Sequence, residues 1–419
     1  MSVIVVGFGL RVAWMLYARP EPVSDYQVYF ALAETLLDNG FFGLDASSAL
    51  WLPGYPSFLA FAMLISREVL WLSFVNVVLS TLACLLVYMV TREVANGDGI
   101  PVVAAGVCAL TPGLILYAPV LGTEQLFIVL FLIAVLLTMR IRGPSPWLGI
   151  GAGVVAGLAA LTRGEMLFYL PVLLAFIWFT AGIDSISHRM RQCALLLAGV
   201  AIVVVPWAVR NAVVVDAGLS LSTVGGMNFF FGHRAGGYGF TTDVPWPLGD
   251  DIGANRIGWK EGLAYVRERP IALLESARDG TYAWLESPEY ALIWSTSTPD
   301  EHEFLVWSHR YIRFEGLIRR ALIISSALSL SLAAAAFIAW RRWSVDLRIL
   351  AAGVVSLNWL GHAVLFFGHP RFRYTVDTIA TILVAITLVT LWKGSGSGSR
   401  AGASASYGDP HGGDAGVDG

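Results

Sequence analysis

The sequence predicts an all-α polytopic membrane protein with about ten transmembrane helices. Of its 419 residues, 56% are hydrophobic and only 14% are charged, and the mean hydropathy is +0.68. A soluble domain carries about 25% charged residues. The net charge of -3 is small and the basic residues are scattered over short loops, which argues against a nucleic-acid-binding surface.

Ten apolar runs approach the length of about 20 residues that a span requires. The run from Gly54 to Ile65 is left out because it holds only about a dozen residues before Arg67 and Glu68, which favours an interfacial or re-entrant helix. The first run lacks a basic start and a small-residue cleavage site, so we interpret it as a span and not as a signal peptide. The candidate spans are residues 1–18, 69–91, 100–120, 122–139, 147–162, 166–181, 193–209, 321–340, 349–367 and 374–392.

The charges of the loops orient these spans. With the N-terminus in the cytoplasm, every inner loop contains a basic residue, as the positive-inside rule requires. Arg210, Arg319 and Arg320 fall on the outer side, in a loop long enough to be translocated regardless of its charge. The inner basic residues are Arg92, Arg140, Arg142, Arg189, Arg191, Arg341, Arg342, Arg348 and Lys393.

This topology divides the chain into four parts. Two of them carry the outer loops: the first outer loop, expected to hold juxtamembrane helices, and a larger one, expected to cap a membrane-embedded site. The tail has almost no apolar residues and is expected to be disordered in the cytoplasm. The parts are 1–209, an N-terminal transmembrane module with the outer loop 19–68, then the outer loop 210–320, the transmembrane helices 321–393, and the tail 394–419.

The stretch SDYQVYFALAETLLDNGFF, residues 24–42, predicts a short amphipathic helix just outside the first span. Ser24 and Gln27 fit a capping box that begins this helix at Asp25, and Asn39-Gly40 ends it. Asp25 has two interpretations. It is a first-turn acid stabilised by the helix dipole, or it is a functional carboxylate at the membrane surface, and the local pattern does not separate the two.

Charged residues from four separate parts of the chain fall at the outer interface in this topology. Arginines there could hold a phosphate through charge-assisted hydrogen bonds, and a carboxylate could act as a base. Arg163 with Glu165 could equally form a local ion pair, and Arg371 and Arg373 could merely anchor a helix end. The charged set is Asp25, Glu124, Arg163, Glu165, His369, Arg371 and Arg373.

Other polar residues give weaker signals. Cys84, Cys108 and Cys193 lie in apolar runs, where a thiol behaves as a small hydrophobe. No His or Cys cluster has metal-ligand spacing, and a lone carboxylate is a poor site for Mg²⁺ or Mn²⁺, so we expect no obligatory bound metal and no other cofactor. Arg11, inside the first span, either faces the bundle interior or snorkels to the surface.

Motifs over nearly the whole chain, apart from the tail, resemble the GT-C superfamily of integral-membrane glycosyltransferases. The pattern is most similar to the protein O-mannosyltransferases and bacterial aminoarabinose transferases, which form a family 39-like group. No single motif is specific, and the resemblance rests on their order and spacing. The motifs are Asp25, Tyr29, Ala33 and Gly40, then WLPGYPSFLAF (51–61), GTEQLF (122–127), GLAALTRGEML (157–167), PWAVRN (206–211), STVGGMNFFFGH (222–233) and HPRFRYTVDTI (369–379).

The resemblance implies transfer of a sugar, with inversion, from a polyprenyl-phosphate donor to an extracytoplasmic protein, lipid or envelope glycan. It also implies a bacterial inner membrane, with the active site on the periplasmic face. The acid of the first outer loop is catalytic in that family, and Asp25 matches it as the general base. The resemblance assigns Arg163, Arg371 and Arg373 to the donor phosphate, and Tyr29, Tyr55, Glu124, Glu165 and His369 to the substrate pocket.

The sequence departs from the family pattern in the first outer loop. Tyr26 stands where many members have a second acid, which argues against a metal site there. Val28 and Leu52 replace basic residues of the aminoarabinose transferases. Two other functions remain open: a transporter or flippase, which predicts an internal repeat that we do not see, and a non-catalytic partner in envelope assembly, in which Asp25 only starts a helix.

Overall fold

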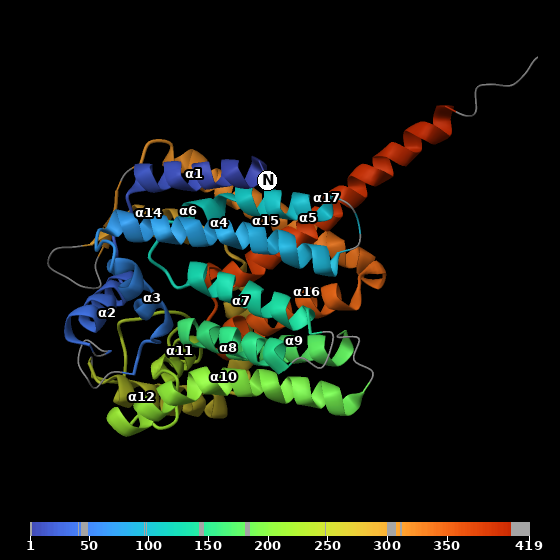
Figure 1. The fold of residues 1–419 in the computed structure, drawn as a ribbon. Coiled ribbons are helices and arrows are strands. Elements are labelled where there is room, and N and C mark those ends of the chain that lie inside the picture. The colour runs from blue at the N-terminus through green and yellow to red at the C-terminus, as the bar shows by residue number, and fades with distance from the viewer. Residues whose placement is uncertain are drawn as a thin grey trace, which may run out of the picture.

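The computed structural model describes residues 2–40, 42, 49–95, 97, 99–141, 146–180, 185–247, 249–299, 307–310 and 312–403. These residues are mainly helical, as predicted, with connecting loops and two strands of three residues each. The long helices run side by side, and the short helices α2, α3, α11 and α12 lie together at one end of the bundle (Figure 1). We refer to this end, which the predicted topology assigns to the outer face, as the outer end.

Apolar helices occupy all ten predicted runs. Among the described residues, five are long and apolar enough to cross a membrane, judged by length and composition, and five shorter apolar helices have 10–17 residues. The figure of ten complete spans therefore stays a prediction. The long segments are α4 (Val69–Val94), α10 (Ile186–Val214), α15 with η1 (Glu315–Arg342), α16 with η2 (Val345–Leu365) and η3 with α17 (Pro370–Lys393); the short ones are α1 (Ser2–Ala18), α5 (Ile100–Leu110), α7 (Glu124–Met139), α8 (Pro146–Thr162) and α9 (Met166–Phe179).

The third predicted run, 100–120, is not one helix. The helix α5 ends at Leu110, and the short helix α6 (Pro112–Tyr117) follows a break at Thr111, whose ψ of 118° is extended. Pro112 explains the break, because a proline ring disfavours helical backbone in the preceding residue and removes one N–H donor. The last carbonyl groups of α5 therefore need partners from outside the helix.

Arg11 supplies those partners and faces the bundle interior. Its guanidinium donates to the carbonyl oxygens of Ala109 (2.7 Å) and Cys108 (3.2 Å) at the end of α5. It also donates to Ser80 Oγ (2.9 Å) on α4. Only 1% of Arg11 is exposed, so the snorkelling alternative is wrong, and Arg11 ties α1, α4 and α5 together.

The first outer loop holds the two predicted juxtamembrane helices, α2 (Asp25–Asn39) and α3 (Gly54–Met63). Gly40 ends α2 with a left-handed φ of 71°, and its N–H donates to Leu36 O, which confirms the predicted end. The predicted capping box is wrong. Ser24 has a φ of 52° and its side chain makes no capping hydrogen bond, because an N-cap side chain reaches the helix only from an extended backbone.

The predicted large outer loop, 210–320, contains the ends of its two flanking helices, because α10 continues to Val214 and α15 begins at Glu315. It is tied to the bundle by α13, whose Trp284 donates to Asn358 Oδ1 of α16 (2.8 Å). The strands of the loop pair antiparallel, with Ser297 opposite His309. Its elements are α11 (Val224–Gly232), α12 (Asp251–Glu268), α13 (Ala272–Leu285), α14 (Tyr290–Thr296), β1 (Ser297–Pro299) and β2 (Trp307–His309).

The C-terminal elements are η1 (Phe337–Arg342), α16 (Val345–Asn358), η2 (Trp359–Leu365, a π-helical turn), η3 (Pro370–Arg373) and α17 (Tyr374–Ala403). The helix α17 runs ten residues into the tail that was predicted to lack structure. Extension of an existing helix avoids the cost of nucleation, which explains why a Gly- and Ser-rich segment can continue it. The rest of the predicted tail, 404–419, lies outside the described residues.

Candidate active site

Five of the predicted site residues meet at the outer end of the bundle. Asp25 is the first residue of α2 and Glu124 the first of α7. Arg163 and Glu165 lie in the turn between α8 and α9. Arg371 lies in η3, just before α17. Each residue stands where a helix begins or ends, so segments far apart in the sequence bring their polar side chains to one place.

Arg371 joins two carboxylates from different parts of the chain. Its Nη1 lies 3.1 Å from Asp25 Oδ2, and its Nε donates to Glu124 Oε1 at 2.6 Å. The ring of Tyr26 lies 5.0 Å from the guanidinium carbon, at cation–π distance. His369 Nδ1 accepts a hydrogen bond from the backbone N–H of Arg371 (3.1 Å). The guanidinium is therefore held from several sides.

Glu124 is the centre of the group. Its Oε1 accepts hydrogen bonds from both Arg371 and Arg163. Its Oε2 accepts one from the hydroxyl of Tyr117 (2.8 Å), and that hydroxyl lies 2.9 Å from the hydroxyl of Tyr26. Only 2% of the Glu124 side chain is exposed. Glu124 thus holds two guanidinium groups in place, and its assignment to the substrate pocket stays a prediction.

Glu165 extends the group on the far side of Arg163. Its Oε2 lies 3.5 Å from Arg163 Nη2 and 2.9 Å from His362 Nε2, and its Oε1 accepts a hydrogen bond from Thr375 (3.0 Å). His362 and Thr375 were not among the predicted site residues. A rule that treats every ionisable residue inside an apolar span as functional would have found His362.

Positive and negative groups therefore alternate along a chain of side chains. The order is Asp25, Arg371, Glu124, Arg163, Glu165 and His362. Exposure differs sharply along it, because 37% of the Asp25 side chain is exposed and the other members are mostly buried. The accessible end of this row of side chains is thus the carboxylate of Asp25 beside the guanidinium of Arg371, and the remaining charged side chains are mostly buried.

The charge states of the loop residues follow from these contacts. Burial opposes ionisation of Glu165, but Arg163 and the hydrogen bond with His362 hold its pKa below the ordinary value. Burial works against the cation at Arg163, yet Glu165 and Glu124 raise its pKa. Burial, together with Arg371, lowers the pKa of His369 to about 4, so its imidazole is neutral at pH 7.

Two of the other predicted residues form an aromatic wall next to Asp25. The ring of Tyr29 lies 5.7 Å from that of Tyr55 and 5.3 Å from that of Trp51. The hydroxyl of Tyr55 accepts a hydrogen bond from Asn76 Nδ2 (2.8 Å). Burial raises the pKa of Tyr29, so this side chain stays a neutral phenol. Tyr55 is 0% and Tyr29 7% exposed, so this wall packs inside the first outer loop and adds no charge beside Asp25.

Arg373, which the resemblance assigns to the donor phosphate, does not contact this group, and its contacts are those of the alternative interpretation, an anchor at a helix end. Its guanidinium donates to Asp377 Oδ1 (2.8 Å), Trp284 O (2.6 Å) and Glu286 O (3.2 Å), and none of its side chain is exposed. Residues two apart at a helix start do not share a face, so Arg371 and Arg373 point to different neighbours. Arg373 anchors the end of α13 to α17.

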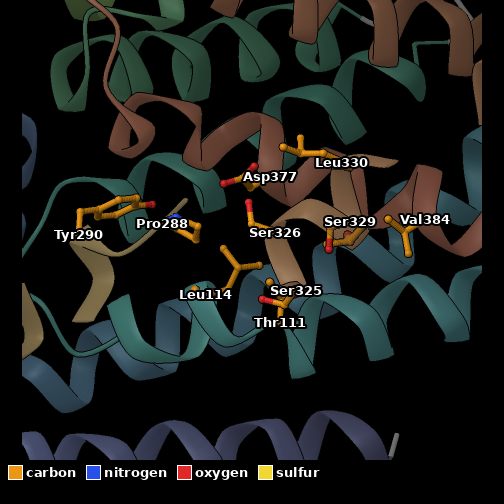
Figure 2. Close-up of a pocket in the computed structure, with 13 residues that line it drawn as sticks. Thr111, Leu114, Pro288, Tyr290, Ser325, Ser326, Ser329, Leu330, Asp377 and Val384 are labelled. Atoms are coloured by element: carbon orange, nitrogen blue, oxygen red, sulfur yellow. The ribbon is translucent and has the colours of Figure 1, made fainter. Parts of the chain in front are cut away.

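A small cavity lies beside Asp377, the ion-pair partner of Arg373 (Figure 2). Asp25 is not among the residues that line it. Its volume is about 30 Å³, about the share of one liquid water molecule. Tyr290 separates it from the group, since its ring lies 5.2 Å from that of Tyr117. The cavity lies between α6, α15 and α17, and its polar lining comes from Thr111, Tyr290, Ser325, Ser326, Ser329, Asp377 and Thr381.

No protein-family model matches the chain, and no curated protein matches its sequence. Two solved structures from Archaeoglobus fulgidus resemble its fold. The archaeal oligosaccharyltransferase AglB, in complex with an inhibitory peptide and a dolichol-phosphate, has a TM-score of 0.54 and 16% identity, over 97% of this chain and 52% of that chain. An oligosaccharyltransferase tethered by a disulfide to an acceptor peptide with the NVT sequon has a TM-score of 0.49 and 17% identity, over 94% of this chain and 49% of that chain.

The chain thus spans about half the length of the solved structures that it resembles. At these identities the likeness concerns the fold. AglB has the GT-C fold, of which the family 39-like transferases are a sibling branch. The likeness to AglB extends over 97% of this chain, so the chain shares the fold of that protein over nearly its whole length.

Proposed function

We propose that the protein is an integral-membrane glycosyltransferase that takes a sugar from a polyprenyl-phosphate donor at the outer face. The observation that carries this proposal is the contact between Asp25 and Arg371, which sets an accessible carboxylate beside a fixed cation. A base and a site for an anion are thereby adjacent. The likeness to AglB, which was solved with a dolichol-phosphate, supports an isoprenoid phosphate as the donor's lipid.

The proposed reaction is a single displacement at the anomeric carbon of the donor sugar. Asp25 accepts the proton of the acceptor's nucleophilic O–H or N–H group. The nucleophile forms a bond to the anomeric carbon as the bond from that carbon to the phosphate oxygen breaks. The electron pair of that bond leaves with the polyprenyl phosphate, and the sugar's configuration is inverted. General-base assistance of this kind contributes roughly 10²- to 10⁴-fold in rate.

Arg371 and Arg163 would stabilise the charge that develops on the leaving phosphate. Both guanidinium groups are already oriented by Glu124, so no reorganisation is needed when the charge appears. We leave Arg373 out of this role because its side chain is fully buried and contacts Asp377, not Asp25 or Glu124. Tyr29 and Tyr55 are buried, so we propose that they shape the wall of the pocket behind Asp25 and do not themselves bind the sugar.

The acceptor would be an extracytoplasmic protein, lipid or envelope glycan, reached from the large outer loop. Loops carry specificity on a fixed scaffold, and α11 to α14 are the described elements of that loop. We propose a multi-pass arrangement in a bacterial inner membrane with the active site on the outer face. Nothing in the fold likeness favours a transporter or flippase.

The test is transfer from a panel of radiolabelled polyprenyl-phosphate sugars by membranes that contain the full chain. We expect Asp25→Asn to lose at least a hundredfold in rate, as loss of a general base does. Asp38→Asn is the matched control, because Asp38 lies on the same helix α2 but forms an exposed pair with Arg67. Non-zero transfer at equal rates by the intact chain and by Asp25→Asn would refute the general-base role.

A non-catalytic partner in envelope assembly makes the opposite prediction. If Asp25 only starts α2, then Asp25→Asn and Asp38→Asn should both keep the protein's cellular function at matched expression. The two variants therefore distinguish the two hypotheses. The transfer assay tests the glycosyltransferase, and the cellular assay tests the non-catalytic partner.

A further inference from the structure

Two carboxylates from different helices turn toward a single cation at the outer end. Asp25 from α2 and Glu124 from α7 both contact the guanidinium of Arg371. Carboxylates that converge in this way on a phosphate-handling site are the usual ligands of Mg²⁺ or Mn²⁺. We infer that Arg371 is a built-in cation that occupies the position of such an ion, so the transfer proposed above proceeds without a divalent metal.

The guanidinium is fixed firmly enough to act in this way. Its Nε donates to Glu124 Oε1 at 2.6 Å, and the ring of Tyr26 packs against it at 5.0 Å. The backbone N–H of Arg371 is bonded to His369 Nδ1 (3.1 Å). The edge of the Arg371 guanidinium that faces Asp25 lies near the accessible part of the site, because 37% of the Asp25 side chain is exposed. A bound anion would therefore meet a cation whose position is already determined.

The same contacts leave no room for a divalent ion. Both oxygens of Glu124 are engaged, Oε1 by Arg371 and Arg163 and Oε2 by Tyr117. Mg²⁺ and Mn²⁺ require several oxygen ligands in a near-octahedral arrangement, and here Asp25 is the one accessible carboxylate of the group. Two guanidinium groups within the group would repel a further cation.

The position after Asp25 fits this inference. A second acid at that position would add a ligand for a metal. The chain has Tyr26 there instead, and its ring contacts the guanidinium of Arg371, the cation that we infer to stand in place of the metal. Within the described part of the chain, no group of three or more His, Cys, Asp or Glu residues is arranged to hold a metal ion. Tyr26 and Arg371 therefore act together as a substitute for a metal and its extra ligand.

The first experiment measures transfer by the detergent-purified full chain before and after treatment with EDTA. We expect the rate to change by less than about twofold, because Arg371 supplies the cation. A loss of more than about tenfold that added Mg²⁺ or Mn²⁺ restores would overturn the inference. This arm depends on the proposed function, since it requires a transfer assay.

The second experiment needs no sugar donor and measures Mn²⁺ binding by electron paramagnetic resonance. The intact chain should bind no Mn²⁺ at this site. Arg371→Ala should free Asp25 and remove one of the two guanidinium groups from Glu124, and should bind one ion per chain. We expect a dissociation constant on the order of 10⁻⁴ to 10⁻³ M, typical of weak oxygen-ligand sites. A second change, Glu124→Gln, should abolish this binding. Stoichiometric Mn²⁺ binding by the intact chain that Glu124→Gln abolishes would overturn the inference.

A matched control exists elsewhere in the chain. Arg319 also contacts two carboxylates, those of Glu289 and Glu315, but it lies far from the group in sequence and its side chain is 30% exposed. Arg319→Ala should gain no stoichiometric Mn²⁺ and should keep metal-independent transfer. Equal Mn²⁺ affinity in Arg319→Ala and Arg371→Ala would mean that any freed carboxylate pair captures metal, which would also overturn the inference.

The outcomes keep this inference separate from the proposed function. If no donor is consumed but Arg371→Ala gains one Mn²⁺, the function fails and the substitution of a metal by Arg371 stands. Should Arg371→Ala fail to fold, Arg371→Lys serves in its place, because it keeps one cation and should bind no Mn²⁺. Mn²⁺ binding by Arg371→Lys equal to one ion per chain would contradict the inference.

Discussion

Removal of the charge at Glu124 is the sharpest test of the buried group. Glu124→Gln keeps the shape of the side chain but leaves two guanidinium groups, those of Arg371 and Arg163, without the carboxylate that they share. Removing one partner of a buried ion pair costs about 3–5 kcal/mol. We take the lower figure, about 3 kcal/mol, because Asp25 and Glu165 still neutralise part of the charge.

This free energy corresponds to a measurable loss of thermal stability. An entropy of unfolding of about 2 cal/mol/K per residue, applied to 419 residues, gives a decrease in Tm of about 3–4 °C. The assay is thermal unfolding of the full chain in detergent, followed by the loss of its folded fraction. Transfer activity should fall as well, because both guanidinium groups lose their orientation.

A matched acid shows whether the effect is specific to the buried group. Glu93 pairs with Arg140 at 3.5 Å, and both side chains are partly exposed, so Glu93→Gln should cost no more than about 1 kcal/mol. A Glu124→Gln variant with an unchanged Tm and unchanged transfer would refute the reasoning, since the guanidinium groups would then not depend on Glu124.

Three further predictions concern other parts of the site and its scaffold. Arg163→Ala should lower the transfer rate about 10²- to 10³-fold at saturating donor. Arg373→Ala should lower Tm but leave the rate per folded molecule unchanged. Transfer activity normalised to the amount of folded protein distinguishes these two effects. Arg11→Met should lower Tm by a few degrees, because two carbonyl groups at the end of α5 lose their donor at about 1–3 kcal/mol each. His369 has a pKa of about 4 when folded and about 6.5 when unfolded, so its contribution to stability is complete above pH 6.5 and is lost as the pH falls toward 4; unfolding scans across this range should show a weaker pH dependence for His369→Gln than for the intact chain.

Hydropathy was sufficient to predict the helices, because burial of apolar residues in a bilayer leaves little choice of backbone structure. All ten predicted runs are helical in the structure, and α2 begins and ends at the predicted residues. The break at Thr111 was missed although Pro112 signals it directly. An apolar run counted by length alone hides such a proline.

The site was harder to predict because it depends on direction as well as on position. The topology correctly brought Asp25, Glu124, Arg163, Glu165 and Arg371 to one end of the bundle. It could not show that Arg373 turns away to bond with Asp377 on its own helix. His362 was missed because an imidazole in an apolar run gives no sign of which carboxylate it will meet, and the π-helical turn that carries it leaves no pattern in the sequence.

The energetics of buried charge favour a functional origin for the group. Well-packed apolar side chains of similar volume are often as stabilising as a buried ion pair, or more so, so stability alone does not explain why three acids and two arginines persist here. Arg11 offers the contrast, because its donors satisfy helix-end carbonyl groups and reach no accessible surface. The Asp25 group is also mostly buried, but it ends in a carboxylate that is 37% exposed and rests on a fixed guanidinium. A purely structural ion network gains nothing from that open end, whereas a base that must meet a substrate requires it.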